Sequence, residues 1–184
     1  MPYIEPVTPG EIRDPELRAL IERCERLGVP GSLFPRILAR VPDYARALLR
    51  AMLISHTEGN VDHKLKEIIR VQLARRAADP YFAGLRSAKA MADGLDEAAI
   101  AAGCDDYERS PRFSVAEKWA LRYADQMYLN PASVDAAFYA GMKQHYSEAQ
   151  IMELGAFIAL HYGMQVFMRT LGNSDNVIDA ARAW

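Results

Sequence analysis

Segment 63–87 holds the residues whose types and spacing are best suited to chemistry. Glu67 and Arg70 lie about one helical turn apart, and Arg86 follows in the next predicted element. A glutamate can donate or accept a proton, and burial would raise its pKa toward neutral pH. A neighbouring Arg70 or Arg86 would lower that pKa again, so the sequence leaves the protonation state of Glu67 open.

The polar residues of the predicted helix share one face. At about 100° per residue, His63, Glu67, Arg70 and Ala74 lie on one side, and Leu65 with its apolar neighbours lies on the other. The simplest interpretation is a solvated face on which Glu67 contacts His63 and Arg70, worth roughly a few tenths of a kcal/mol. The alternative is a pocket in which these polar groups are buried.

The histidines do not have the spacing of a metal site. His56 and His63 could meet across a turn, but there is no i, i+4 histidine pair and no His-Glu-x-x-His motif, so no metal is expected. His56 also suits a helix C-terminus as a cation. His161 lies in a helix that is apolar almost all round, where a polar side chain needs a partner, whereas His145 is expected in an exposed loop.

Helical periodicity predicts the elements that position these residues, and strand signals are almost absent, so the fold class is all-α. We expect a single domain over 1–184. It comprises an N-terminal arm at 1–13, a helical core at 14–172 and a C-terminal tail at 173–184. Within the core we expect one helix to run from Pro80 to Gly94.

Capping residues mark several predicted helix starts. Asp62 precedes the helix that carries Glu67. Capping boxes at Ser114-x-x-Glu117 and Ser147-x-x-Gln150 open two long helices. The helix between these two is predicted to open at Asn130-Pro131.

Composition narrows the class of protein. The net charge is −2 and no block of like charge occurs, so no nucleic-acid or anionic membrane partner is expected. We expect no apolar run to reach the length that spans a bilayer, and the polar, proline-rich start is unlike a signal peptide. We therefore expect a cytoplasmic protein. Cys24 and Cys104 form no redox or metal spacing and are expected to be apolar filler.

The order of residues in 63–87 resembles the core of the carboxymuconolactone decarboxylase and alkylhydroperoxidase D-like family. In that family a helix with a glutamate leads into a Cys-x-Tyr-Cys turn, and a histidine follows on the next helix. Here Glu67 and Tyr81 match that pattern. Asp79 and Phe82 stand at the two cysteine positions, and Arg86 stands at the histidine position. The resemblance extends loosely over about 33–172.

This resemblance implies an alkylhydroperoxidase D-like bundle of about eight helices that forms a homo-oligomer, a trimer or a hexamer. It also implies that Glu67 lies in a pocket sheltered by neighbouring helices or by another subunit. In the family's last helix, polar side chains occupy the positions that match Tyr162 and Gln165. Here both positions remain polar, although the residue types differ.

The missing cysteines argue against the family's thiol chemistry. A thiol pair at a helix N-terminus reacts because the helix dipole stabilises a thiolate. Asp79 cannot replace a thiolate, and Asp before Pro is a good helix start. Phe82 most simply packs in the core, and Tyr81 is either core filler or a hydroxyl donor in a pocket. We predict no cysteine-dependent peroxidase activity from this motif.

The preferred function is a cofactor-independent enzyme that uses acid–base chemistry on a small organic acid or carbonyl compound: decarboxylation, hydration, isomerisation or lactone opening. Alternatives are a non-catalytic ligand-binding oligomer and, less favoured, a peroxidase or thiol oxidoreductase that uses Cys24 or Cys104. The candidate catalytic residues are Glu67, His63, Tyr81 and His56. The candidate substrate-binding residues are Arg86, Arg70, His161, Tyr162, Gln165 and Phe82.

Overall fold

The computed structural model describes residues 3–172, so the predicted tail at 173–184 lies outside the described residues. Within them the chain is all-α, as predicted, with ten α-helices, two 3₁₀ helices and no strand. The helices are α1 (Pro15–Leu27), α2 (Leu33–Leu38), α3 (Pro42–Thr57), α4 (His63–Arg76), α5 (Pro80–Gly84), α6 (Ala88–Ala92), α7 (Glu97–Asp105), α8 (Val115–Leu129), α9 (Ala136–Met142) and α10 (Glu148–Thr170), with η1 (Pro9–Glu11) and η2 (Pro131–Ser133) as the 3₁₀ helices.

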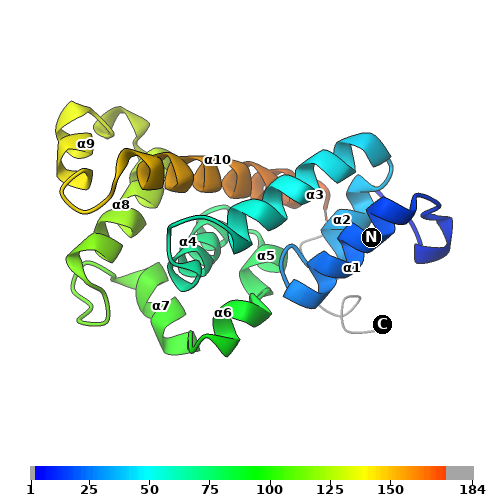
Figure 1. Ribbon diagram of the computed structural model, residues 1–184, viewed down its shortest axis with the longest axis horizontal. Helices are drawn as coiled ribbons and strands as arrows, with labels where there is room; N and C mark the ends of the chain where they lie inside the picture. Colours follow the sequence, from blue (N-terminus) through cyan, green and yellow to red (C-terminus); the bar gives the residue numbers. More distant parts are fainter. Residues whose placement is uncertain (1–2, 173–184) are drawn as a thin grey trace.

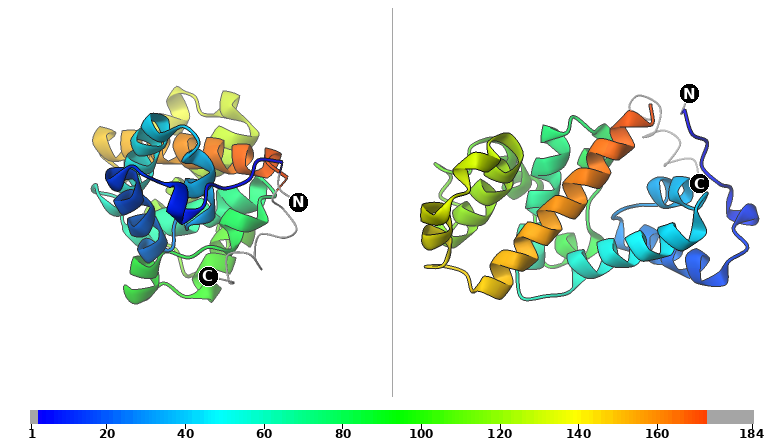
Figure 2. Two further views of the ribbon diagram at one scale, coloured as in Figure 1. Left: turned by 90° about the vertical axis from the view of Figure 1, so that its right-hand side faces the viewer. Right: turned by 90° about the horizontal axis from the view of Figure 1, so that it is seen from above.

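The longest helix, α10, spans much of the molecule (Figure 1). Helices α8 and α9 lie at one of its ends, and α1 and α2 lie toward the other. The view from above shows α3 approaching α10 at an angle (Figure 2). Helix α4 lies at the centre and packs against both α3 and α10, as well as against α5, α7 and α8.

The central position of α4 explains why it is buried on all sides. Every residue from Leu65 to Ala74 is buried, including the charged and amide side chains. One apolar cluster packs α4 against α7, α8 and α10, and a second packs its C-terminal end against α1, α2 and α3. The solvated polar face that the helical pattern favoured is therefore wrong, because tertiary packing covers it.

The helix starts that depend on local capping are as predicted. Asp62 accepts a hydrogen bond from the Leu65 amide, and the capping boxes at Ser114 and Ser147 are both formed. The segment after Pro131 differs, because a 3₁₀ turn comes first and α9 begins only after Asp135.

The single helix predicted over 80–94 is instead two short helices, α5 and α6, separated by an extended segment at 85–87. Arg86 Nη1, which donates to the carbonyls of Ala83 and Leu85, and the buried guanidinium of Arg70 both stabilise this break. Arg70 donates to the backbone carbonyls of Phe82 (2.5 Å) and Leu85 (2.7 Å), and so satisfies groups that a continuous helix would have bonded internally. Ser87 then caps α6 by accepting from the Ala90 amide.

Helix α10 is long and apolar enough to cross a membrane by length and composition alone. The expectation that no apolar run reaches this length is therefore wrong. Core helices of water-soluble proteins meet the same criterion, and here α10 packs on α3, α4 and α8.

Candidate functional site

A buried ion pair lies at the centre of the bundle, formed by two residues of α4 that are one helical turn apart. Arg70 binds Glu67 in a bidentate manner, with Nε 2.8 Å from Oε2 and Nη2 2.8 Å from Oε1. Both side chains are fully buried. The Ser87 amide also donates to Glu67 Oε1, at 2.9 Å. This arrangement holds the carboxylate in a single orientation.

The protonation state of Glu67, which the sequence left open, follows from these contacts. Burial alone would raise the pKa of Glu67, but the charge and hydrogen bonds of Arg70, with a smaller contribution from His56, hold that pKa well below its ordinary value. Glu67 is therefore a permanent carboxylate near neutral pH. Its predicted role as the group that exchanges a proton stays a prediction, and this geometry does not favour it.

His56, near the end of α3, is placed to respond to that carboxylate. Its Nε2 atom lies 3.1 Å from Glu67 Oε2, in a close polar contact that does not meet the geometry of a hydrogen bond. The negative charge favours the tautomer with the proton on Nε2, which leaves Nδ1 as a lone-pair acceptor. That Nδ1 is buried and finds no partner among the described residues. Burial lowers the pKa of His56, with Glu67 opposing the shift, so the ring is neutral at pH 7.

His63 opens α4, and both of its ring nitrogens are bonded. Its Nδ1 lies 2.6 Å from the backbone oxygen of His56, which can only accept, and its Nε2 lies 2.7 Å from Ser87 Oγ. His63 thereby ties the end of α3 to the start of α6. The two imidazoles of His56 and His63 are adjacent, with centroids 4.7 Å apart, as the spacing suggested.

His161, on α10, faces His56 with ring centroids 5.7 Å apart. Ser55 Oγ donates to the Met52 carbonyl and lies 3.3 Å from His161 Nε2, so this nitrogen is the donor of the pair. His161 Nδ1 is then an acceptor, and it too is buried without a partner among the described residues. Burial and the nearby His56 and Arg70 hold the pKa of His161 well below its ordinary value.

Gln165 and Tyr162, both predicted to bind substrate, make no side-chain hydrogen bond with Glu67, His56 or His161 among the described residues. Gln165 Nε2 donates to the Arg70 carbonyl at 3.0 Å, which docks α10 on α4. Tyr162 is half-buried and stacks edge-on against Tyr128, with centroids 4.1 Å apart. Neither contact shows a group directed at a substrate, so their predicted binding roles stay predictions.

Tyr81 and Phe82 are core residues. The Tyr81 hydroxyl donates to the Pro30 carbonyl at 2.7 Å and accepts from the Phe34 amide, so it ties α5 to the loop before α2. Phe82 is fully buried and packs edge-on against Phe34. Of the two interpretations of Tyr81, this geometry favours the core residue.

The two arginines predicted to anchor a substrate anion are already occupied. Arg70 donates hydrogen bonds to Glu67 and to two backbone carbonyls. Arg86 pairs with Glu97 through Nε at 2.7 Å and Nη2 at 2.9 Å, and that pairing, chiefly its hydrogen bonds, raises the pKa of Arg86. Either residue would have to break these bonds to bind a guest, because a guanidinium has a fixed number of donors.

Sequence reasoning missed the buried Lys66. Its Nζ donates to the carbonyls of Ser55 (3.0 Å) and Glu58 (2.6 Å) and to Glu153 Oε1 (3.0 Å). Glu153 on α10 in turn accepts from the amides of Asn60 and Val61. These bonds fix the loop between α3 and α4, and with it the position of His56 relative to Glu67.

Asp79 caps α5 as expected, and its second carboxylate oxygen is also buried. Its Oδ1 accepts from the amides of Tyr81 (2.9 Å) and Phe82 (3.4 Å), whereas its buried Oδ2 has no hydrogen-bond partner among the described residues. Burial, offset in part by these amides and by Arg70 and Arg169, raises the pKa of Asp79 to about 6. Asp79 is thus a carboxyl group that titrates near neutral pH.

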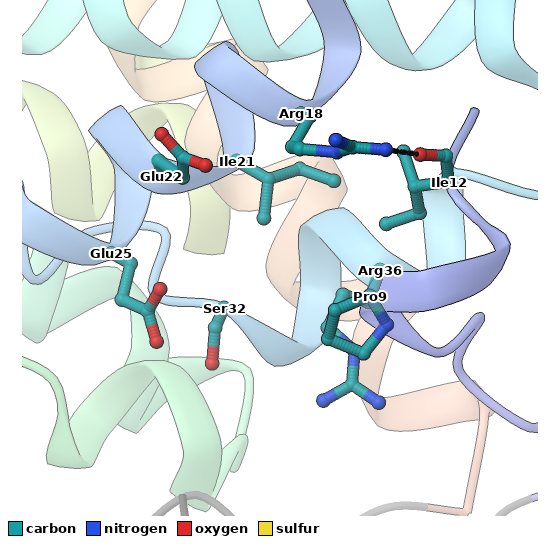
Figure 3. Close-up of a pocket in the computed structure, with 8 residues that line it drawn as sticks. All are labelled: Pro9, Ile12, Arg18, Ile21, Glu22, Glu25, Ser32 and Arg36. Atoms are coloured by element: carbon teal, nitrogen blue, oxygen red, sulfur yellow. Dashed lines mark hydrogen bonds between the residues drawn. The ribbon is translucent and has the colours of Figure 1, made fainter. Parts of the chain in front are cut away.

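Four of the cavities on the described residues lie elsewhere, and none of these four is lined by Glu67, His56 or His161. Figure 3 shows the one of about 170 Å³ between the N-terminal arm, α1 and α2, with Ile12 and Ile21 among the charged side chains around it. Another, of about 280 Å³, includes Asp79 in its lining. The histidine cluster is therefore closed off from these cavities in the single chain.

Comparison with known proteins identifies solved structures with a similar fold, but it does not assign the chain to a family. No family model matches the chain. No protein in a search of curated sequences matches it. Two solved structures of the debrominase Bmp8 are similar. The apo structure has a TM-score of 0.78 at 20% identity and covers 92% of this chain and 89% of that one.

The second is a cysteine-to-alanine variant of Bmp8 in complex with 2,3,4-tribromopyrrole. Its TM-score is 0.77 at 18% identity, and the match covers 97% of this chain and 94% of that one. At this level of identity the likeness shows that the helical fold is shared over almost the whole chain. It assigns no activity to this protein.

Proposed function

We propose that this chain is an alkylhydroperoxidase D-like protein that acts without a cofactor as an acid–base enzyme on a small organic acid or carbonyl compound. The observation that supports it best is the pair of buried, unpartnered Nδ1 atoms of His56 and His161, on rings 5.7 Å apart. The similar fold of an enzyme solved with a small organic molecule agrees with this proposal.

These two atoms support a role beyond packing, although Gln72 Oε1 and Gln165 Oε1 are also buried without a partner among the described residues. Each buried acceptor left without a donor costs about 1–3 kcal/mol. The same bundle bonds both ring nitrogens of His63, so the fold is able to satisfy an imidazole where nothing else is required of it. Unsatisfied, neutral imidazoles beside a fixed carboxylate are typical of sites that accept a proton.

In the proposed reaction, a guest hydrogen-bonds to Nδ1 of His56, and this nitrogen takes its proton. The imidazolium that forms is stabilised by Glu67, 3.1 Å from Nε2, which acts as a carboxylate that orients and stabilises the ring. In a decarboxylation, the carboxylic acid of the substrate gives its proton to His56, and the bond between the carboxylate and its neighbouring carbon then breaks. CO₂ leaves, the electrons of that bond enter a sink within the substrate, and the imidazolium returns the proton to the resulting carbanion or enolate. Glu67 is thus a positioning residue, and His56 is the catalytic one.

We also propose that the protein is a homo-oligomer, the trimer or hexamer that the resemblance implies. The outward side of α10 is apolar from Met152, which is 70% exposed, to Phe167, which is 41% exposed. Ala156 and Ala159 between them are also exposed, so a second helix could approach closely. Sedimentation velocity at micromolar concentration should show the oligomer, and Ala159→Arg should dissociate it. A wild-type monomer would contradict the proposal.

The activity is tested with a panel of small carboxylic acids, keto acids and lactones, including a carboxymuconolactone, followed by mass spectrometry. His56→Gln keeps an N–H toward Glu67 but has no base at Nδ1, so turnover should fall on the order of 10²–10⁴-fold. The control is His145→Gln, which alters an exposed histidine and should leave turnover unchanged. Equal turnover in wild type and His56→Gln would refute the role of His56.

A ligand-binding protein without catalysis is the second candidate, because none of four cavities on the described residues is lined by Glu67, His56 or His161. Mass spectrometry of the native protein that finds a bound acid, with no conversion of that acid, would favour this candidate. Thiol chemistry is not proposed. Cys24 and Cys104 are both buried, and burial raises their pKa to about 12 and about 11.

A further inference from the structure

One side of α10 carries large apolar residues that the other described helices leave open. Met152 is 70% exposed and Phe167 is 41% exposed. They are fifteen residues apart, and 100° per residue leaves about 60° between them around the helix, so they share a side. The view from above shows α10 with no helix drawn over it (Figure 2). An apolar side of this length is typical of a surface that a partner covers.

The charged residues of α10 are placed at its two ends. Glu148 is the first residue of the helix, and Arg169 is the last but one. Between them only Glu153 is charged, and it is bonded to the buried Lys66. Glu148 and Arg169 are twenty-one residues apart, which leaves about 60° between them around the helix, so both lie on one side of it. That side is therefore acidic at its start and basic at its end.

Both end charges can take a further partner. Glu148 is 79% exposed, and its Oε1 accepts from Lys143 Nζ at 2.7 Å, whereas its Oε2 makes no hydrogen bond among the described residues. Arg169 is exposed and donates from Nη1 to the Ala77 carbonyl at 3.0 Å. Its charge acts on Asp79, but no carboxylate of the described residues lies within ion-pair distance of it.

A hollow beside Glu148 suits an arginine side chain. It measures about 320 Å³ and is lined by apolar, aromatic and charged side chains: Tyr139, Lys143, Glu148, Ile151 and Met152. The aliphatic stem of an arginine can lie along Met152 while its guanidinium binds the carboxylate of Glu148. Since Lys143 already occupies Oε1, the arginine would bind Oε2.

We propose that α10 packs against α10 of a second copy in the antiparallel direction, with Arg169 of each copy bound to Glu148 of the other. The twofold axis then passes beside Ala159, which is exposed and lies about midway between the two charges. One rotation makes both ion pairs and closes the contact. A parallel pair would instead place like charges together, and antiparallel helix dipoles attract each other.

The proposal rests on the proposed homo-oligomer and gives the symmetry of its contact. In this register Met152 of one copy lies close to Phe167 of the other, so the large apolar residues are covered at both ends. The small Ala156 and Ala159 let the two helices approach closely at the centre. Three such pairs build a hexamer, whereas a plain trimer has no twofold contact. Of the two expected assemblies, the proposal therefore selects the hexamer.

Ala159→Cys tests the axis. The introduced thiols of two copies lie on either side of it, so mild oxidation should convert most of the chain to a covalent dimer on a non-reducing gel. Met152→Cys tests the direction, because across an antiparallel pair its two thiols are about 20 Å apart and cannot bond. Wild type, in which Cys24 and Cys104 are buried, should not link. Linking through Met152→Cys, or none through Ala159→Cys, overturns the proposal.

Charge reversal tests the ion pairs. Glu148→Arg and Arg169→Glu each place like charges at both ends, so the dissociation constant measured by sedimentation should rise roughly 30-fold. Copies of one variant paired with copies of the other have opposite charges at both ends. With Ala159→Cys in both and a mass tag on one, oxidation of an equal mixture should therefore give mostly mixed dimers, against about half for random pairing.

Recovery of pairing in the mixture also shows that both variants fold. The matched control mixes Glu22→Arg with Arg26→Glu, which reverse an exposed pair on α1, and these copies should pair at random. A mixed fraction near half for the α10 variants overturns the proposal.

These outcomes are separable from those of the proposed function. A trimer in sedimentation that Ala159→Cys does not link would keep the homo-oligomer and remove the twofold pair. A linked pair with no conversion of any acid would keep this contact and remove the enzyme, and turnover that depends on His56 in a chain that does not link would do the reverse.

Discussion

Glu67→Gln tests how firmly the ion pair holds the centre of the bundle. Glu67 Oε1 accepts from Arg70 Nη2 and the Ser87 amide, and Oε2 accepts from Arg70 Nε. A glutamine oxygen can keep the two bonds at Oε1. Its NH₂ group then faces Arg70 Nε–H, donor against donor, and the buried guanidinium loses its counter-charge.

The cost follows from these losses. One charge-assisted hydrogen bond contributes about 1.5–3 kcal/mol, and breaking a buried ion pair typically costs about 3–5 kcal/mol in all. We therefore expect Glu67→Gln to lower the free energy of unfolding by about 3–5 kcal/mol, measured by urea titration with circular dichroism. The loss should not depend on salt, because solvent ions screen buried pairs weakly.

The pH dependence has a definite sign. The pKa of Glu67 is depressed in the folded state, so its stabilising effect is complete above the unfolded value of about 4.3 and is lost as pH falls through the folded value. The difference between wild type and variant should therefore be constant from pH 5 to pH 8. The control, Glu22→Gln, breaks an exposed pair with Arg26 and should cost less than about 0.5 kcal/mol. A cost below about 1 kcal/mol for Glu67→Gln would refute the reasoning.

Three further predictions concern Asp79, the two cysteines and Lys66. Asp79→Asn should gain about 2–3 kcal/mol relative to wild type between pH 4 and pH 8, because a raised folded pKa makes ionised Asp79 destabilising above pH 6; parallel stability curves would contradict this. Cys24 and Cys104 should react slowly with a disulfide reagent at pH 8 in the native chain and rapidly in urea; fast native reaction of either thiol would show that it is accessible. Lys66→Met should lower the free energy of unfolding by about 2–4 kcal/mol and speed hydrogen exchange in the loop at 58–62, because Glu153 loses its buried partner. Unchanged exchange would contradict this and would show that Glu153 has found another partner.

What the sequence predicted well is what depends on local interactions. The all-α fold and the capping boxes at Ser114 and Ser147 follow from periodicity and from bonds spanning three residues. The cap at Asp79 is of the same kind. The burial of its second oxygen is not local, because it depends on how α5 packs against the rest of the bundle.

The environment of Glu67 shows why the site was harder to predict. On the helix alone, Glu67 and Arg70 form an ordinary surface pair. Their burial results from α3 and α10, which are distant in sequence. Likewise, the break at 85–87 is stabilised in part by Arg70, fifteen residues before Leu85, so turn propensity alone could not reveal it. The partners Ser55 and Ser87 give no sequence signal either, because isolated serines are common on helices and caps.

The most direct test of the account is the tautomer and charge of His56 and His161, read from ¹⁵N chemical shifts and long-range ¹H–¹⁵N correlations of the imidazole rings. His56→Gln and His161→Phe assign the signals. Both rings should be neutral at pH 7, with the proton on Nε2 and an unprotonated Nδ1. Imidazolium rings at pH 7, or protons on Nδ1, would remove the buried acceptors on which the proposed chemistry depends.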